Sequence, residues 1–212
     1  MRGSRIIAAL IVLAGAVMDV RGAGGAVDAS TGVLQRMLAL NSHLHAYTAR
    51  IHVDIAMRTF PFISPSLDGK YYHKEPSKDA LVFATVPALA KQFNKVYPRI
   101  ESPARWNAVY AVTFDGIENG TASFKLVPRI HGRVDHIDAK VDVQTATISQ
   151  MTWYYNDGGY AVLNQEYQQI RGNYVPARQT GHVDVPHYKA DVASSFTNFK
   201  INPRIPDSIF RQ

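Results

Sequence analysis

Apolar and polar side chains alternate along the whole of residues 47–58. The intervening polar positions include Arg50, His52 and Asp54, and the apolar positions are Tyr47, Ala49, Ile51, Val53, Ile55 and Met57. Successive side chains of a strand point to opposite faces, so this alternation predicts an antiparallel strand with one buried face and one solvated face.

The strand pattern recurs along the rest of the chain, separated by residues that favour turns. Strands are expected over residues 67–74, 80–86, 106–115, 121–127, 134–143, 147–155, 160–170, 174–185 and 187–199. Pro76 would break the ladder between the first two of these. Asn119-Gly120 is typical of a hairpin, because both residues tolerate a positive φ. About ten closely spaced strands predict an all-antiparallel sheet curled on itself.

Two segments have a helical period instead. The apolar side chains of residues 30–44 fall on one helical face, and Leu89 and Phe93 begin a similar stripe that ends before Pro98. We expect these helices to cover the concave face of the curved sheet, because an apolar concave face is not left in water. They either fill that face permanently or act as a lid over a cavity, and both arrangements remain open.

Residues 1–26 have the pattern of a secretory signal peptide. Arg2 and Arg5 precede the apolar run of residues 6–18, and small residues follow it at 22–26. A membrane-spanning helix would need about 20 apolar residues, and this run stops at Asp19. We therefore expect cleavage after Gly24 or Ala26, a single domain over residues 27–212, and a periplasmic or secreted protein.

The composition of the 212 residues is that of a packed globular domain, with 46% hydrophobic and 19% charged residues. There is no cysteine, which excludes disulfides, thiolate metal ligands and cysteine nucleophiles. The net charge is +6, but the basic residues are spread along the chain and form no stripe of the kind that binds nucleic acid. No nucleic-acid partner is expected.

The candidates for chemistry are histidines with nearby carboxylates. One group is His131, Asp135, His136 and Asp138, and a second is His182, Asp184 and His187. His136 and Asp138 share a face of a strand while Asp135 points away, so only part of the first group can converge. We interpret both groups as solvent-facing, and expect neither a metal nor a catalytic residue. No G-x-S-x-G motif or glycine-rich phosphate loop occurs, and no cofactor is expected.

Aromatic residues are spread over the expected strands, including Tyr154-Tyr155, which must place one ring on each face of the sheet. Most strand aromatics belong to a core or to cross-strand pairs. A cavity for a hydrophobic ligand is the alternative.

The order of these elements resembles a known family. A leader and a helix precede the strand of residues 47–58, the next strand ends in Lys74-Glu75-Pro76, and a helical insertion, a hairpin meander and the tail of residues 196–210 follow. This layout resembles the outer-membrane lipoprotein carrier superfamily (LolA/LolB-like), the lipoprotein-sorting proteins, over nearly all of the chain after the leader. The resemblance implies an α+β, mostly antiparallel β fold: an incomplete, half-open β-barrel with helices as a lid over an apolar cavity that receives acyl chains.

The chain departs from the family pattern at two places. The best-known carriers have Lys-Arg-Pro where this chain has Lys74-Glu75-Pro76, and their Arg helps to hold the lid. Glu75 has the opposite charge, so we do not expect that contact to the lid in this chain. The Asp-Gly-Lys-x-Leu-Trp segment of the carriers is also missing. Because no cysteine follows the leader, the resemblance implies a soluble carrier rather than the membrane-anchored acceptor.

The sequence thus favours an exported, non-enzymatic carrier or binder of acyl chains, from a lipoprotein or another lipid. Membrane-bound donor and acceptor proteins would be its partners. The alternative is a structural or interaction module of the envelope with a filled core, and a metal-dependent or hydrolytic enzyme comes third. The cavity candidates are Tyr47, Ile51, Val53, Ile55, Met57, Met151 and Trp153, with Leu89 and Phe93 on the lid.

Overall fold

The computed structural model describes residues 23–60, 62–75, 78–83 and 100–211, and its strands form one ten-stranded sheet. The helices are α1 (Ala23–Ala39), α2 (Pro103–Val109) and the short 3-10 helix η2 (Asp207–Arg211). The strands are β1 (Ala46–Met57), β2 (Ser66–Lys74), β3 (Lys78–Phe83), β4 (Tyr110–Glu118), β5 (Thr121–Pro128), β6 (Val134–Asp142), β7 (Thr147–Tyr155), β8 (Tyr160–Ile170), β9 (Asn173–Val185) and β10 (Tyr188–Ile201).

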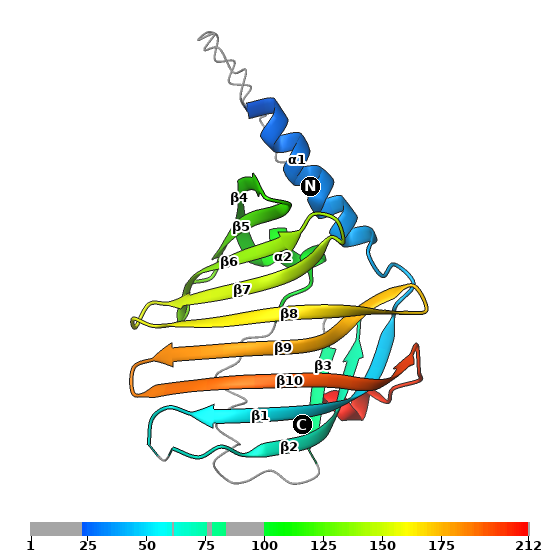
Figure 1. The fold of residues 1–212 in the computed structure, drawn as a ribbon. Coiled ribbons are helices and arrows are strands. Elements are labelled where there is room, and N and C mark those ends of the chain that lie inside the picture. The colour runs from blue at the N-terminus through cyan, green and yellow to red at the C-terminus, as the bar shows by residue number, and fades with distance from the viewer. Residues whose placement is uncertain (1–22, 61, 76–77, 84–99, 212) are drawn as a thin grey trace, which may run out of the picture.

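The sheet is an antiparallel meander in which all paired strands follow one another in the sequence, except that β1 pairs with β10. Its order is β3-β2-β1-β10-β9-β8-β7-β6-β5-β4, so β1 lies between β2 and the last strand (Figure 1). The prediction of ten antiparallel strands is confirmed. β3 and β4 form the two edges of this order, so the sheet is open and does not close into the barrel that a complete ring of pairs would make.

The tight hairpin between β4 and β5 follows from its two turn residues. Asn119 has a φ of 49° and Gly120 a φ of 78°, the left-handed conformations that a two-residue hairpin turn requires. The sequence-based prediction of this turn is confirmed.

The first helix is shifted from the expected range of residues 30–44. α1 begins at Ala23 and ends at Ala39. Beyond its end, Asn41 adopts a left-handed φ of 60°, which does not continue a helix. The Asn41 side chain donates to the Tyr174 carbonyl at 2.7 Å and accepts from the Tyr174 backbone N–H at 2.8 Å. This pair of bonds fixes the chain reversal between α1 and β1.

The expected strand over residues 106–115 is wrong in its first half. Residues Pro103–Val109 form α2, and β4 begins only at Tyr110. Proline is favoured at the first position of a helix, and Pro103 occupies that place after Ser102. The Trp106 indole N–H donates to the Glu101 carbonyl at 3.0 Å, which ties the buried ring to the start of the helix.

Three clusters of buried apolar residues form the core. The largest is built on β4–β9 and contains Trp106, Trp153, Phe124 and Leu126. Val33 and Met37 of α1 join this cluster, and a second one lies on β1, β2 and β10. A third, smaller cluster joins residues around the start of β1.

The prediction that helices cover the concave face is not confirmed by the described residues, in which α1 and α2 contribute only to the largest cluster. The expected helix of residues 87–97, with Leu89 and Phe93, lies outside the described residues. Within the described part of the chain, no helix has the length and apolar character needed to cross a membrane.

Candidate functional site: the inner face of β1, β2 and β10

The alternation in β1 produces one buried row and one solvated row, as the sequence predicts. Ile51, Val53 and Ile55 are 5%, 6% and 5% exposed, while the intervening His52 and Asp54 are exposed. We call the side of the sheet that carries the buried row the inner face, and the opposite side the outer face. Tyr47 and Met57 are also buried and belong to the same row.

Neighbouring strands extend this row into an apolar surface. In the antiparallel register Ile51 lies opposite Phe196 and Ile55 lies opposite Val192 of β10, and Val53 lies opposite Leu67 of β2. Directly paired residues point to the same face of a sheet. These side chains form the second core cluster, which is separate from the one on β4–β9.

Gly69 of β2 is required by the packing of this surface. It lies opposite Ile51 and Phe83 in the sheet. A Cβ atom at Gly69 would approach the Phe83 Cδ1 atom to 2.7 Å and the Val82 carbonyl oxygen to 2.8 Å. The missing side chain therefore gives the Phe83 ring its place against the apolar cluster.

One end of the inner face is polar. The Tyr71 hydroxyl donates to Asp79 Oδ1 at 2.5 Å, and the same oxygen lies 2.8 Å from Nδ1 of His73. The Tyr47 ring stacks on the His73 ring with centroids 4.9 Å apart. Burial raises the pKa of both the Tyr47 and the Tyr71 hydroxyl, so both phenols are neutral across the physiological pH range.

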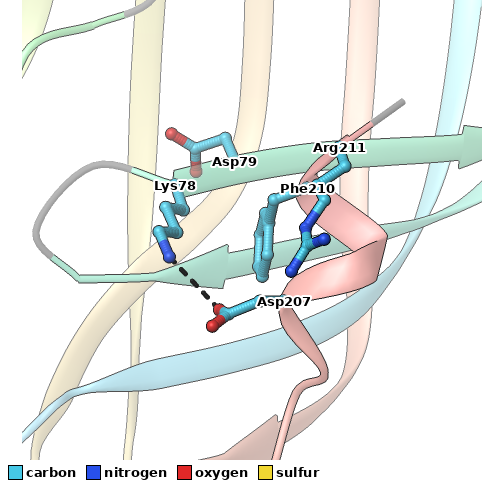
Figure 2. A pocket seen from close by; sticks show the side chains of 5 residues that line it. All are labelled: Lys78, Asp79, Asp207, Phe210 and Arg211. Atoms are coloured by element: carbon cyan, nitrogen blue, oxygen red, sulfur yellow. Dashed lines mark hydrogen bonds and ion pairs between the residues drawn. The ribbon is translucent and has the colours of Figure 1, made fainter.

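A small cavity of about 250 Å³ adjoins this polar end (Figure 2). Its lining combines Lys78 and Asp79 of β3 with Asp207, Phe210 and Arg211 of η2. Figure 2 shows the Phe210 ring lying between the Lys78 chain and η2, on the side of β3 where the Lys78 and Asp207 side chains meet. The cavity is therefore built where the C-terminal helix rests against the edge strand.

Lysines of the β2–β3 hairpin hold η2 in this position. Asp207 Oδ1 lies 2.9 Å from Nζ of Lys74 and 3.2 Å from Nζ of Lys78. The hydrogen bonds from Lys74 and then from Lys78 lower the pKa of the Asp207 carboxyl. Lys74 of the Lys74-Glu75-Pro76 element is thus a contact to the C-terminal segment in this chain.

Glu75 of the same element contacts the start of β1. Its backbone N–H donates to the His45 carbonyl at 3.0 Å, and its Oε2 lies 3.4 Å from Nδ1 of His45. The acid at this position therefore connects the hairpin to the chain that enters β1.

Two of the predicted cavity residues lie elsewhere on the sheet. Met151 and Trp153 of β7 are 2% and 1% exposed and belong to the largest core cluster with Phe124 and Leu126. The structure brings Ile51, Val53 and Ile55 together in the second cluster and places Tyr47 in the third. Leu89 and Phe93 lie outside the described residues.

Sequence reasoning missed His73 and Asp79 as members of the site. Both lie on the inner face because His73 is paired with Tyr47 and also with Asp79. The alternation of residues 67–74 already places Tyr71 and His73 on one face, and this was the signal available in the sequence.

Of the two histidine groups, His136 and His182 lie on strands and pair with carboxylates, whereas His131 lies in the loop between β5 and β6. His182 bonds to Asp191 of β10 at 2.6 Å, and Asp184 bonds instead to Lys189 at 2.8 Å. His187 occupies the turn between β9 and β10 with a φ of 68°. Among the described residues, no three histidine or acidic side chains gather closely enough to hold a metal ion.

The expectation that Asp135 points away from His136 is wrong. Asp135 Oδ2 lies 2.6 Å from Nδ1 of His136, whereas Asp138 Oδ1 lies 3.9 Å from Nε2. The pairing of β6 with β7 shifts register between Val134 and His136. Such a bulge interrupts the strict alternation of faces, so neighbouring residues can meet there.

Comparison with known proteins relates the chain to others by fold. No protein-family model matches the sequence, and no curated protein matches it. A crystal structure of a DUF1329 family protein from Desulfovibrio piger has a TM-score of 0.60 at 13% identity, covering 88% of this chain and 97% of that one.

Two further crystal structures have the same architecture. A putative outer membrane lipoprotein-sorting protein domain from Vibrio parahaemolyticus has a TM-score of 0.61 at 12% identity, covering 85% of this chain and 95% of that one. A LolA superfamily protein from Nitrosomonas europaea has a TM-score of 0.59 at 10% identity, covering 86% and 97%. The chain has the fold of these structures, and the resemblance drawn from the sequence is confirmed at the level of fold.

Proposed function

We propose that this protein is an exported, non-enzymatic carrier or binder of acyl chains, which it holds against the inner face of β1, β2 and β10. The observation that carries the proposal is the apolar surface of Ile51, Val53, Ile55 and Phe196, which forms a cluster of its own beside the main core. The fold shared with a lipoprotein-sorting domain supports the same function.

Binding would rest on burial of hydrocarbon. Each methylene group removed from water contributes about 0.8 kcal/mol, so an acyl chain gains affinity in proportion to the length that the apolar row can cover. The chain would have to displace side chains that already contact one another, since Ile51, Val53 and Ile55 are nearly inaccessible. Loading therefore requires a rearrangement of the side chains that fill this face.

We place this carrier in the periplasm or outside the cell, after removal of residues 1–26. Its partners would be the acyl chains of a lipoprotein or another lipid, and membrane-bound proteins that donate and accept them. The contacts between η2 and the β2–β3 hairpin would remain at the end of the site, where Lys74 and Lys78 hold Asp207.

A structural or interaction module of the envelope is the second candidate. The observation in its favour is the same low exposure of Ile51, Val53 and Ile55, because a face that is completely filled by side chains has no need of a ligand. In that case the inner face would be an ordinary core.

Native mass spectrometry of the protein purified from its producing cells tests the choice between the two. A carrier should show additional mass that is released by organic solvent and identified as an acyl lipid. A protein of the unmodified chain mass that also fails to take up a fluorescent fatty acid would overturn the carrier proposal and favour the filled-core module.

A further inference from the structure

A groove of about 660 Å³ lies on the outer face of the sheet. β1, β10, β9 and β8, which follow one another in the sheet (Figure 1), supply most of its lining, and residues 64–66 between β1 and β2 complete it. We call it the outer groove. Most of its lining side chains lie on the opposite side of the sheet from the apolar surface described above, although Ile55 and Val192 also border it. The role inferred for the outer groove does not rest on acyl-chain binding.

The strand register explains the hollow. Two neighbouring rows of paired residues cross the four strands: Asp54, Ala193, Thr180 and Asn164 in one, and Ala56, Asp191, His182 and Val162 in the other. Ala56 and Ala193 have short side chains and lie next to the longer Asp54 and Asp191, so the outer surface of the sheet is recessed at the two alanines. Ser64 and Ser66 stand beside this low area.

A histidine–carboxylate pair is fixed at the centre of the groove. Asp191 Oδ1 lies 2.6 Å from Nδ1 of His182, and Arg58 Nε donates to Asp191 Oδ2 at 2.6 Å. The bond from His182 and then that from Arg58 lower the pKa of Asp191, so the carboxylate is ionised. Nδ1 of His182 donates to the ionised Asp191, so Nε2 is the ring nitrogen left for a ligand, and it has no hydrogen-bond partner among the described residues.

The other polar groups also favour a ligand that donates hydrogen bonds. Asp54 is exposed and accepts a hydrogen bond from the Ser66 hydroxyl. Asn164 accepts from Gln150 at 2.7 Å and lies 3.4 Å from the Thr180 hydroxyl. The lining contains the two carboxylates Asp54 and Asp191 and, among its described residues, no lysine or arginine. The neighbouring Arg58 bonds to Asp191, and the excess of carboxylates in the lining disfavours phosphate and other anions.

Tyr160 adds an aromatic surface at the edge of these polar groups. It is 37% exposed, and its ring centroid lies 5.8 Å from that of His182. The Tyr160 ring has an apolar face and a polar hydroxyl, and Val162 and Pro65 line the same groove. This combination suits a ligand that presents both C–H and O–H groups.

We propose that the outer groove binds a neutral saccharide. Sugar hydroxyls would donate to Asp54, Asp191 and the free Nε2 of His182, while the C–H face of a ring packs on Tyr160. The acceptor-rich lining favours a neutral polyol over an acidic sugar, because Arg58, the cation beside it, is already bonded to Asp191.

Titration of the ¹⁵N-labelled protein with triacetylchitotriose, a neutral trisaccharide, tests the proposal. We expect saturable shifts of the amide resonances of Asn164 and His182 at sugar concentrations up to about 10 mM, the range of weak binding. Sialyllactose, which carries a carboxylate, should bind more weakly at the same site.

Tyr160→Ala tests the aromatic contact, and Tyr154→Ala is its matched control. Tyr154 lies opposite Tyr160 in the sheet, has the same 37% exposure and is not part of the groove lining. Tyr160→Ala should weaken triacetylchitotriose binding by about tenfold or more, as expected for an aromatic anchor, whereas Tyr154→Ala should bind as the unmodified protein does. Equal effects of the two variants, or no saturable shifts with the unmodified protein, would overturn the proposal.

Discussion

The Tyr71 hydroxyl donates a 2.5 Å hydrogen bond to Asp79, and these two residues belong to the two strands at one edge of the sheet. Asp79 is also 2.8 Å from His73, and Tyr47 stacks on that histidine. The polar end of the inner face therefore depends on one half-buried carboxylate that joins β3 to β2.

Replacement of Tyr71 by Phe should destabilise the fold. The change removes the donor to Asp79 but keeps the ring that packs edge-on against Phe196, with centroids 5.6 Å apart. A hydrogen bond to a charged group contributes about 1.5–3 kcal/mol, and we expect a loss within that range in urea-induced unfolding.

Tyr72→Phe is the matched control, because Tyr72 lies next in the chain, on the outer face, with Lys70 Nζ 5.0 Å from its ring centroid. This variant should change the free energy of unfolding by less than about 0.5 kcal/mol. An equally small effect of Tyr71→Phe would mean that the bond to Asp79 does not hold the edge of the sheet.

Asp207 should make the attachment of η2 dependent on pH. Its pKa is held below the ordinary value of 3.8 by Lys74 and then by Lys78. Since the folded state has the lower pKa, the stabilisation is fully present above the unfolded pKa and is lost as the pH falls through the folded value. Asp207→Asn should therefore increase hydrogen exchange of residues 203–211 at neutral pH, and this difference from the unmodified protein should shrink as the pH falls below the ordinary Asp pKa of 3.8 and through the lower folded value.

Asp157→Asn is the control for that experiment. Asp157 is similarly exposed, at 47% against 50% for Asp207, and pairs with Arg133 in a different loop. Exchange of residues 203–211 that rises equally in both variants would contradict a specific role of the lysine contacts.

His187 should be replaceable by glycine with a gain in stability. It follows Pro186 in the two-residue turn between β9 and β10 and has a φ of 68°. Proline followed by a residue of positive φ is the pattern of a type II turn, which favours Gly or Asn at the second place. We expect His187→Gly to raise the free energy of unfolding by about 0.5–1 kcal/mol, because the cost of about 1–2 kcal/mol of a left-handed conformation in a non-glycine residue exceeds the conformational entropy that Gly loses on folding. A loss of stability would instead indicate a structural role for the exposed imidazole.

Substitutions at Met151 and Val53 should distinguish an effect on core stability from an effect on acyl-chain binding. It belongs to the large cluster on β4–β9, and Met→Ala at such a buried place costs about 2–5 kcal/mol. Met151→Ala should therefore lower stability while leaving the affinity for a fluorescent fatty acid unchanged in the folded protein. Val53→Thr, which adds a hydroxyl to the inner face without adding volume, should reduce that affinity. Reduced affinity in Met151→Ala alone would move the binding site to β7.

The strands were predictable because their signals are local. Alternation over residues 47–58 predicted the strand that the structure has at Ala46–Met57, and Asn119-Gly120 predicted a hairpin whose φ values agree. α2 was missed because Trp106 and Val109 also fit a strand pattern, and only the Ser102-Pro103 pair signalled a helix start.

The polar cluster could not be assembled from the sequence in the same way. His73 and Asp79 meet Tyr47 only through the register of three strands. The close pairing of Asp135 with His136 was likewise hidden, because it depends on a register shift against β7 that alternation alone does not reveal.

Photo-crosslinking with a diazirine-bearing fatty acid, followed by peptide mapping, tests the central claim most directly. We predict label on peptides that contain residues 46–57 and 190–199, at inner-face positions such as Ile51, Val53 and Phe196, and loss of that label when unmodified palmitate is added in excess. Label confined to other strands, or label that palmitate does not displace, would contradict an acyl-chain site on the inner face.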